Sequence, residues 1–142
     1  VGLGQLPHLE RFLAQRRKLV RAYFAGFEGG AAVKLGVGLP FADFENSNWH
    51  MFQITLPLDQ LSIDRAGFMG QLKERGIGSG VHYPAIHLFS LYRARGFKEG
   101  MFPHAERFGA TNVTLPLFTL MNEGDVARVC RAVNEICEQY GK

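Results

Sequence analysis

Long apolar runs, abundant cysteine and dense positive charge are all missing from this sequence. No stretch of its 142 residues approaches the run of about 18 to 20 apolar residues that spans a bilayer, and no secretory pattern opens the chain. The formal charge is only +3 and charged residues make up 20% of the chain, whereas a nucleic-acid-binding face is more densely basic. These features predict a cytoplasmic protein with no membrane and no nucleic-acid partner.

The chain has only two cysteines, Cys130 and Cys137, which lie seven residues apart in a helical pattern. That spacing puts both thiols on one buried stripe, about 10 Å of helix rise apart, so they cannot form a disulfide with each other. Reduced cysteines in a core are typical of an intracellular protein.

Sequence motifs of several enzyme classes are absent as well. There is no Gly-x-Ser-x-Gly elbow, and the glycines at 76, 78 and 80 precede an expected strand, whereas a nucleotide-binding fingerprint opens a helix. His82 and His87 are five residues apart with Pro84 between them, so they cannot form a zinc pair on one helix face. A metal-dependent enzyme that uses these histidines is therefore a minor alternative.

Apolar periodicity and turn residues predict a mixture of helices and strands. A long helix should end at Gly29-Gly30, a second should begin at Ser62 or Asp64, and a third should follow Asn122, which forms a near capping box with Asp125. Shorter helices are expected within 87–95 and 103–108, and strands around 33–37 and within 49–56, 77–83 and 112–115. We therefore expect an α+β fold: a small, mostly antiparallel sheet of three or four strands with helices packed mainly on one face.

The stretch GVHYPAIH, residues 80–87, concentrates polar aromatic groups. Glycines flank a strand that ends in His82-Tyr83-Pro84, and both imidazole and phenol combine hydrogen bonding with a flat apolar face. Such groups suit sugar hydroxyls, phosphate oxygens or a nucleobase. From the residues alone, a binding role and internal packing with satisfied hydrogen bonds both stay open.

The segment LKERGIGSGVHYPAIHLFSLYRARGFKEGMFPHAE closely resembles the C-terminal part of the DegT/DnrJ/EryC1/StrS family, the pyridoxal-phosphate-dependent aminotransferases of nucleotide-sugar biosynthesis. The stretches QLPHLERFLAQRRKLVRAY, NWHMFQITLP and TLPLF also resemble that family, so the similarity covers nearly the whole chain. It implies the C-terminal domain of a fold type I transferase, with residues 1–30 as a connecting helix that follows an absent large domain and 31–142 as the small domain.

The resemblance also implies a function. The full-length parent would use pyridoxal phosphate and, as usual donor, glutamate to convert a keto nucleotide-sugar to an amino sugar, as a homodimer. His82 and Tyr83 would contact the nucleotide-diphosphate sugar, His87 would help to hold the loop or contact the substrate, and packing is the expected role of Trp49 and His50.

None of the five lysines of the chain has the family's surroundings for a Schiff base, so we expect no bound cofactor and no activity from this chain alone. These residues are Lys18, Lys34, Lys73, Lys98 and Lys142. A stand-alone nucleotide-sugar-binding module without catalysis is the alternative.

Overall fold

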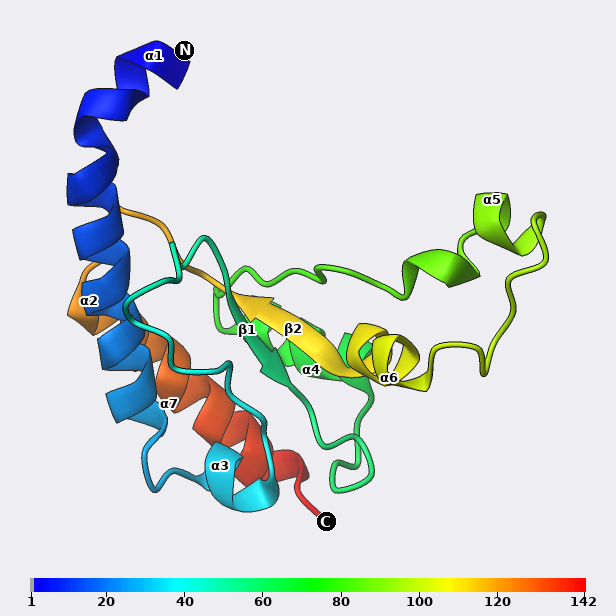
Figure 1. The fold of residues 1–142 in the computed structure, drawn as a ribbon. Coiled ribbons are helices and arrows are strands. Elements are labelled where there is room, and N and C mark those ends of the chain that lie inside the picture. Colours follow the sequence, from blue (N-terminus) through cyan, green and yellow to red (C-terminus); the bar gives the residue numbers. More distant parts are fainter. Residues whose placement is uncertain (1) are drawn as a thin grey trace.

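The computed structural model describes residues 2–142 (Figure 1). The chain begins with a helical rod made of α1 (Gly2–Gln5), the 3-10 turn η1 (Leu6–His8) and α2 (Leu9–Phe27). Pro7 lies in the 3-10 turn, where it interrupts the regular helix, so the expected long helix is divided near its start. The C-terminal half of α2 enters the core through Leu19, Val20, Tyr23 and Phe27, all with no exposed surface. Its N-terminal half projects beyond the body of the domain (Figure 1).

The sheet has two antiparallel strands, β1 (Phe52–Thr55) and β2 (Asn112–Leu115), paired as Phe52 with Leu115 and Ile54 with Val113. Side chains alternate across a strand, so these four residues share one face. The Tyr23 ring stacks on Phe52 with the ring centroids 4.4 Å apart, so this face is the one that α2 covers.

Two further helices contribute buried side chains to the same hydrophobic core as α2 and the two strands. Helix α4 (Arg65–Glu74) begins at Asp64, whose side chain accepts a hydrogen bond from the Gly67 backbone, and buries Phe68 and Leu72. Helix α7 (Glu123–Tyr140) begins with the expected capping box and buries a long apolar stripe. That stripe comprises Val126, Val129, Cys130, Ala132, Val133, Ile136 and Cys137. The predicted starts of both helices are confirmed.

The sheet is smaller than the three or four strands that the sequence predicted. Around residues 33–37 the chain forms helix α3 (Ala31–Leu35) instead of a strand, and only Gly38 makes a single bridge to Thr55. Within 77–83 only Gly80 pairs, again by one bridge, to Thr114. Within residues 2–142 the chain therefore forms two strands, each flanked by a segment that pairs at one point.

A slender arm, residues 84–103, extends away from the body (Figure 1). It carries the turn η2 (Ile86–Leu88) and the short helix α5 (Ser90–Arg93), and it returns through α6 (Pro103–Thr111), which runs directly into β2. Several large apolar side chains of the arm are exposed, namely Ile86, Phe89, Leu91, Met101 and Phe102.

None of the helices within residues 2–142 combines the length and apolarity needed to cross a bilayer.

Candidate functional site

The segment before the arm, residues 77–83, runs along the edge of β2, where Gly80 pairs with Thr114, and we call it the strap. The Gln53 side chain donates a hydrogen bond to the His82 carbonyl, and the His82 ring Nδ1 lies 2.9 Å from Thr114 Oγ1. Gln53 and Thr114 are direct cross-strand partners. The two strands thus hold His82 from both sides, at its backbone and at its ring.

Asn112, the first residue of β2, locks the strap at a second point. Its side chain has no exposed surface, and its Oδ1 accepts a hydrogen bond from the His82 backbone N–H at 3.1 Å. Its Nδ2 donates to the Phe108 carbonyl at 2.8 Å and to the Tyr83 carbonyl at 3.4 Å. A buried amide with these partners satisfies backbone groups that the sheet ladder does not reach. Sequence reasoning missed this residue, because nothing in the pattern distinguishes it from an ordinary strand position.

Tyr83 presents its ring to the surface, with 61% of the residue exposed. The His82 and Tyr83 rings meet edge to face, their centroids 5.1 Å apart and their planes at 88°. The structure therefore brings these two predicted site residues together, one half-buried and held by the sheet, the other exposed. Their roles in substrate contact stay a prediction.

His87 lies in a different environment. It is 9% exposed, its Nε2 lies 2.9 Å from Glu106 Oε1, and its ring packs edge to face against Phe102 at 4.9 Å. His87 and Tyr83 line a shared hollow of about 270 Å³, but a ring nitrogen of His87 is occupied by Glu106. This position suits the loop-holding role expected for His87 better than direct substrate contact.

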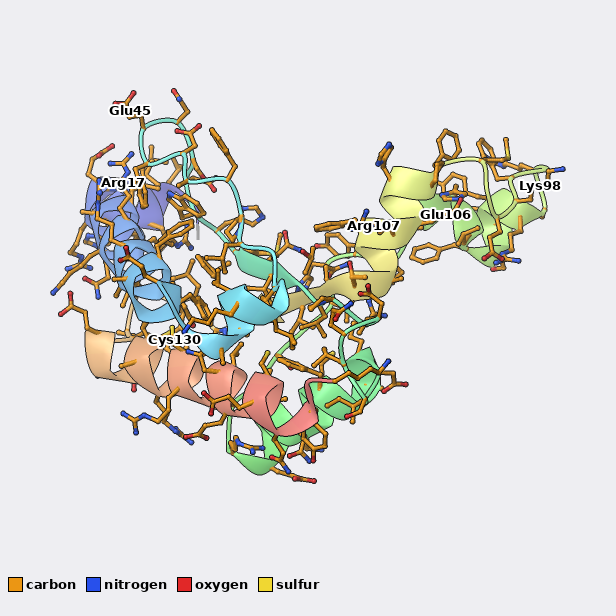
Figure 2. All side chains as sticks on the ribbon, turned by 90° about the horizontal axis from the view of Figure 1, so that it is seen from below. Arg17, Glu45, Lys98, Glu106, Arg107 and Cys130 are labelled. Atoms are coloured by element: carbon orange, nitrogen blue, oxygen red, sulfur yellow. The ribbon has the colours of Figure 1, made fainter. Side chains whose placement is uncertain are left out.

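Glu106 holds the base of the arm together through hydrogen bonds to His87, Gly100 and Phe102, and we call this group of four residues the clasp. Its carboxylate also accepts hydrogen bonds from the backbone N–H groups of Gly100, at 2.9 and 3.0 Å, and Phe102, at 3.1 Å. The Gly100 bond, followed by the Phe102 and His87 bonds, lowers the pKa of Glu106 below its ordinary value. Figure 2 shows Glu106 at the root of the arm and Lys98 at its tip. The clasp therefore connects three points of the arm.

The expectation of packing for Trp49 and His50 is correct for only one of them. Trp49 is 4% exposed and lies against Phe24 and Phe44, with ring centroids 6.2 and 5.7 Å away. His50 is exposed, and both its backbone N–H and its ring Nδ1 contact Asn48 Oδ1. The Asn-x-His spacing is the signal that sequence reasoning overlooked.

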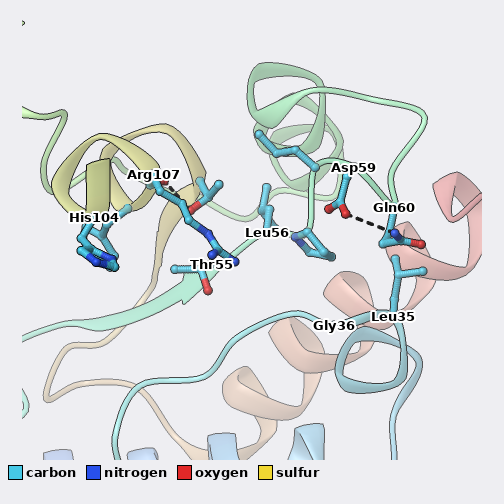
Figure 3. Close-up of a pocket in the computed structure, with 12 residues that line it drawn as sticks. Leu35, Gly36, Thr55, Leu56, Asp59, Gln60, His104 and Arg107 are labelled. Carbon is cyan, nitrogen blue, oxygen red and sulfur yellow. Dashed lines mark hydrogen bonds between the residues drawn. The ribbon is translucent and has the colours of Figure 1, made fainter. Parts of the chain in front are cut away.

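A larger hollow of about 660 Å³ lies between the end of β1, the loop 56–60 and α6 (Figure 3). Among the residues around it are Thr55, Asp59, Gln60, His104 and Arg107. A hydrogen bond from the Gln60 side chain lowers the pKa of Asp59. Asp59, Gln60, His104 and Arg107 are all exposed, and none of the predicted site residues lines this hollow.

The candidate metal site finds no support in the part of the chain that the structure describes. Residues 2–142 contain no group of three or more histidine, cysteine, aspartate or glutamate side chains placed to hold a metal ion.

The lysines do not fit a Schiff base with a cofactor. All five are exposed; Lys18 pairs with Glu123 at 3.6 Å, and Lys142 donates to the Asp59 carbonyl at 3.0 Å. A Schiff-base lysine needs a desolvated pocket or a neighbouring cation that favours its neutral amine. The surroundings of these five lysines therefore do not favour a Schiff base.

Comparisons with known proteins agree with the resemblance seen in the sequence. The model of the DegT/DnrJ/EryC1/StrS aminotransferase family matches residues 1–134. An uncharacterized protein of Methanocaldococcus jannaschii is 30% identical over 98% of this chain, which covers 36% of that protein.

Solved structures show the same similarity. A putative sugar aminotransferase from Streptococcus pneumoniae, in apo form, is 25% identical with a TM-score of 0.83. The match covers 97% of this chain and 34% of the aminotransferase chain. That protein has also been solved in PLP and PMP forms. The S. venezuelae protein DesV, in complex with a ketimine intermediate, is 30% identical with a TM-score of 0.79. The match covers 94% of this chain and 34% of the DesV chain. The chain thus spans about a third of the length of these relatives.

Proposed function

This chain belongs to the DegT/DnrJ/EryC1/StrS aminotransferase family, and we propose that it is the small domain of a longer pyridoxal-phosphate-dependent enzyme. The parent enzyme converts a keto nucleotide-sugar to an amino sugar, with glutamate as the amine donor. The family match over residues 1–134 and the sugar aminotransferase among the solved relatives support this proposal.

The observation that carries the proposal is the way the sheet presents His82 and Tyr83. Gln53, Asn112 and Thr114 hold the strap through both its backbone and the His82 ring, so little conformational freedom remains to be lost on binding. The exposed Tyr83 phenol can stack on a sugar or base and bond to a hydroxyl, and the His82 ring lies edge-on beside it. His82 and Tyr83 contact the nucleotide-diphosphate sugar, while His87 and Glu106 hold the arm next to them.

The parent enzyme provides the Schiff-base lysine from outside this chain. The exposure of all five lysines supports the proposal that the Schiff-base lysine belongs to another part of the parent enzyme. By itself the chain binds no pyridoxal phosphate and does not transfer amino groups.

The N-terminal rod makes the contact with the rest of the parent enzyme. Leu3, Leu6 and Leu9 are 88%, 65% and 45% exposed, an apolar row that another body must cover if it is to be shielded from water. Residues 1–30 are the connecting helix to the large domain, although the C-terminal half of α2 already packs in the core of the small domain, residues 31–142.

The parent enzyme is a cytoplasmic homodimer. The exposed apolar residues of the arm, with Phe89 at 46% and Leu91 at 60%, are suited to contact a second copy. Two reduced, buried cysteines fit the reducing environment of the cytoplasm.

A titration of the chain with TDP-glucose tests the proposal. As one part of a binding site, the chain should bind in the millimolar range, with NMR shifts at His82 and Tyr83 and no heat at micromolar concentrations. Tyr83→Ala should remove those shifts, whereas the matched control Tyr92→Ala, on the arm, should keep them.

Micromolar affinity would favour the stand-alone binding module instead. Shifts confined to residues remote from the strap would contradict the site.

A further inference from the structure

The tautomer of His50 is fixed by its neighbour Asn48. Asn48 Oδ1 lies 3.1 Å from the His50 backbone nitrogen and 3.3 Å from its ring Nδ1. A backbone N–H only donates, so the Asn48 atom at this position must be the oxygen and not the amide nitrogen. A carbonyl oxygen only accepts, so Nδ1 must carry a hydrogen. In the neutral ring, Nε2 then has a free lone pair and acts as a hydrogen-bond acceptor.

The backbone before His50 is held in an unusual conformation that directs the ring outward. Trp49 has φ of 47°, in the left-handed region that bulky residues rarely adopt. Its indole is fixed between Phe24 and Phe44, and its backbone N–H donates to Ser47 Oγ at 3.1 Å. Strained backbone of this kind persists only where its surroundings enforce it, and it is common at binding sites. The indole is the anchor, and His50 is the exposed group that it positions.

His50 lies just before β1, whereas His82 of the strap bonds to Asn112, the cross-strand partner of Thr55 at the other end of that strand. The five residues from His50 to Thr55 span about 17 Å of extended chain, so a ligand that contacts both His50 and His82 must be elongated, as a nucleotide-diphosphate sugar is. Figure 1 shows the segment that leads into β1 on the side of the domain where the N-terminal half of α2 projects, and the chain after α4 running along β2 toward the arm.

We propose that His50 is a further substrate-binding residue, whose Nε2 accepts a hydrogen bond from a hydroxyl group of the nucleotide-diphosphate sugar. The inference rests on the proposed function, since it names an additional contact of the same site. Asn48 is the positioning residue, because it fixes which ring nitrogen accepts. The contact selects ligands with a hydroxyl donor within reach, in contrast to the stacking surface that Tyr83 offers.

The first test needs no ligand. Long-range ¹H–¹⁵N spectra of the chain at about pH 8, where an ordinary imidazole is neutral, should show His50 with its hydrogen on Nδ1. Asn48→Ala should give a mixture of the two tautomers, and Asn48→Asp, which keeps an acceptor oxygen in place, should restore the Nδ1–H form. A His50 ring with its hydrogen on Nε2 in the unaltered chain would overturn the inference.

The second test is the titration with TDP-glucose, with His50 and Tyr83 followed separately. Both residues should shift with the same dissociation constant, and Asn48→Ala should weaken binding about two- to fivefold, because only the fraction of rings with a free Nε2 can accept the hydrogen bond. His8→Gln, a change at an exposed histidine on the N-terminal rod, should leave the affinity unchanged.

The outcomes separate the two proposals. Shifts at Tyr83 without shifts at His50, or full affinity in Asn48→Ala, would refute the role of His50 and leave the proposed function intact. No shift at either residue with 10 mM ligand, about ten times a dissociation constant of 1 mM, would contradict both.

Discussion

Replacing Asn112 by alanine should destabilise the domain more than any other single amide deletion outside the helices. The change removes three hydrogen bonds, those with the His82 N–H, the Phe108 carbonyl and, at 3.4 Å, the Tyr83 carbonyl. A buried polar group left without its partner costs about 1–3 kcal/mol. The Asn112 side chain has no exposed surface, whereas Phe108, His82 and Tyr83 are all at least partly exposed, so water can reach part of what the amide supplies. We therefore expect a loss of about 2–3 kcal/mol in the free energy of unfolding.

Urea unfolding followed by circular dichroism measures this loss as a shift of the midpoint at constant m-value. Asn46→Ala is the matched control: Asn46 is exposed and bonds only within its own loop, so its replacement should change the free energy by less than about 0.5 kcal/mol. A cost below about 0.5 kcal/mol for Asn112→Ala as well would refute the account of how the strap is held.

Three further predictions concern the core, the clasp and the strap. Burial raises the pKa of the Cys130 thiol to about 12 and that of Cys137 to about 11, so neither thiol should react with iodoacetamide at pH 8 until urea unfolds the chain. Because the pKa of Glu106 is lowered, its clasp should stay closed above the ordinary glutamate pKa of about 4.3 and open only as the pH falls through the lower folded value. The Gly100 amide signal should therefore titrate with a midpoint below about 4.3, and Glu106→Gln should abolish that titration; a midpoint at or above 4.3 would contradict the clasp. Gly109→Ala would place a Cβ 2.5 Å from the backbone nitrogen of Ala85, at the start of the arm, so it should cost about 1–3 kcal/mol by thermal unfolding, while Gly70→Ala, in open space on α4, should not destabilise the domain.

The helices were the most predictable part of the fold, because their end signals are local. Asp64 caps α4, Gly76 adopts the left-handed conformation with φ of 69° just past its end, and Asn122 with Asp125 forms the capping box of α7. Strand β2 also has the predicted bounds of 112–115.

The strands that failed did so for identifiable reasons. The strand around 33–37 was predicted from the β-branched residues Val33 and Val37. The chain forms a helix there instead, because the neighbouring residues are good helix formers, namely Ala31, Ala32, Lys34 and Leu35. The strap leaves the sheet after Gly80 because the His82 N–H bonds to the Asn112 side chain instead of a strand backbone. That contact spans 30 residues of sequence, so no local pattern could reveal it.

The site was predictable in part. The sequence singled out His82, Tyr83 and His87, and the structure places the first two side by side and ties the third to Glu106. The strand expected over 49–56 begins only at Phe52, because the left-handed backbone at Trp49 interrupts it. The same interruption turns His50 outward, where packing had been expected.

The central claim is that this chain contributes substrate contacts but no Schiff-base lysine. Incubating the chain with pyridoxal phosphate, reducing it with borohydride and mapping the adducts by mass spectrometry tests this claim directly. We predict only low, scattered labelling over the five exposed lysines and no amine transfer from glutamate to a keto sugar nucleotide. A stoichiometric adduct at one lysine, together with amine transfer by the chain alone, would contradict the account.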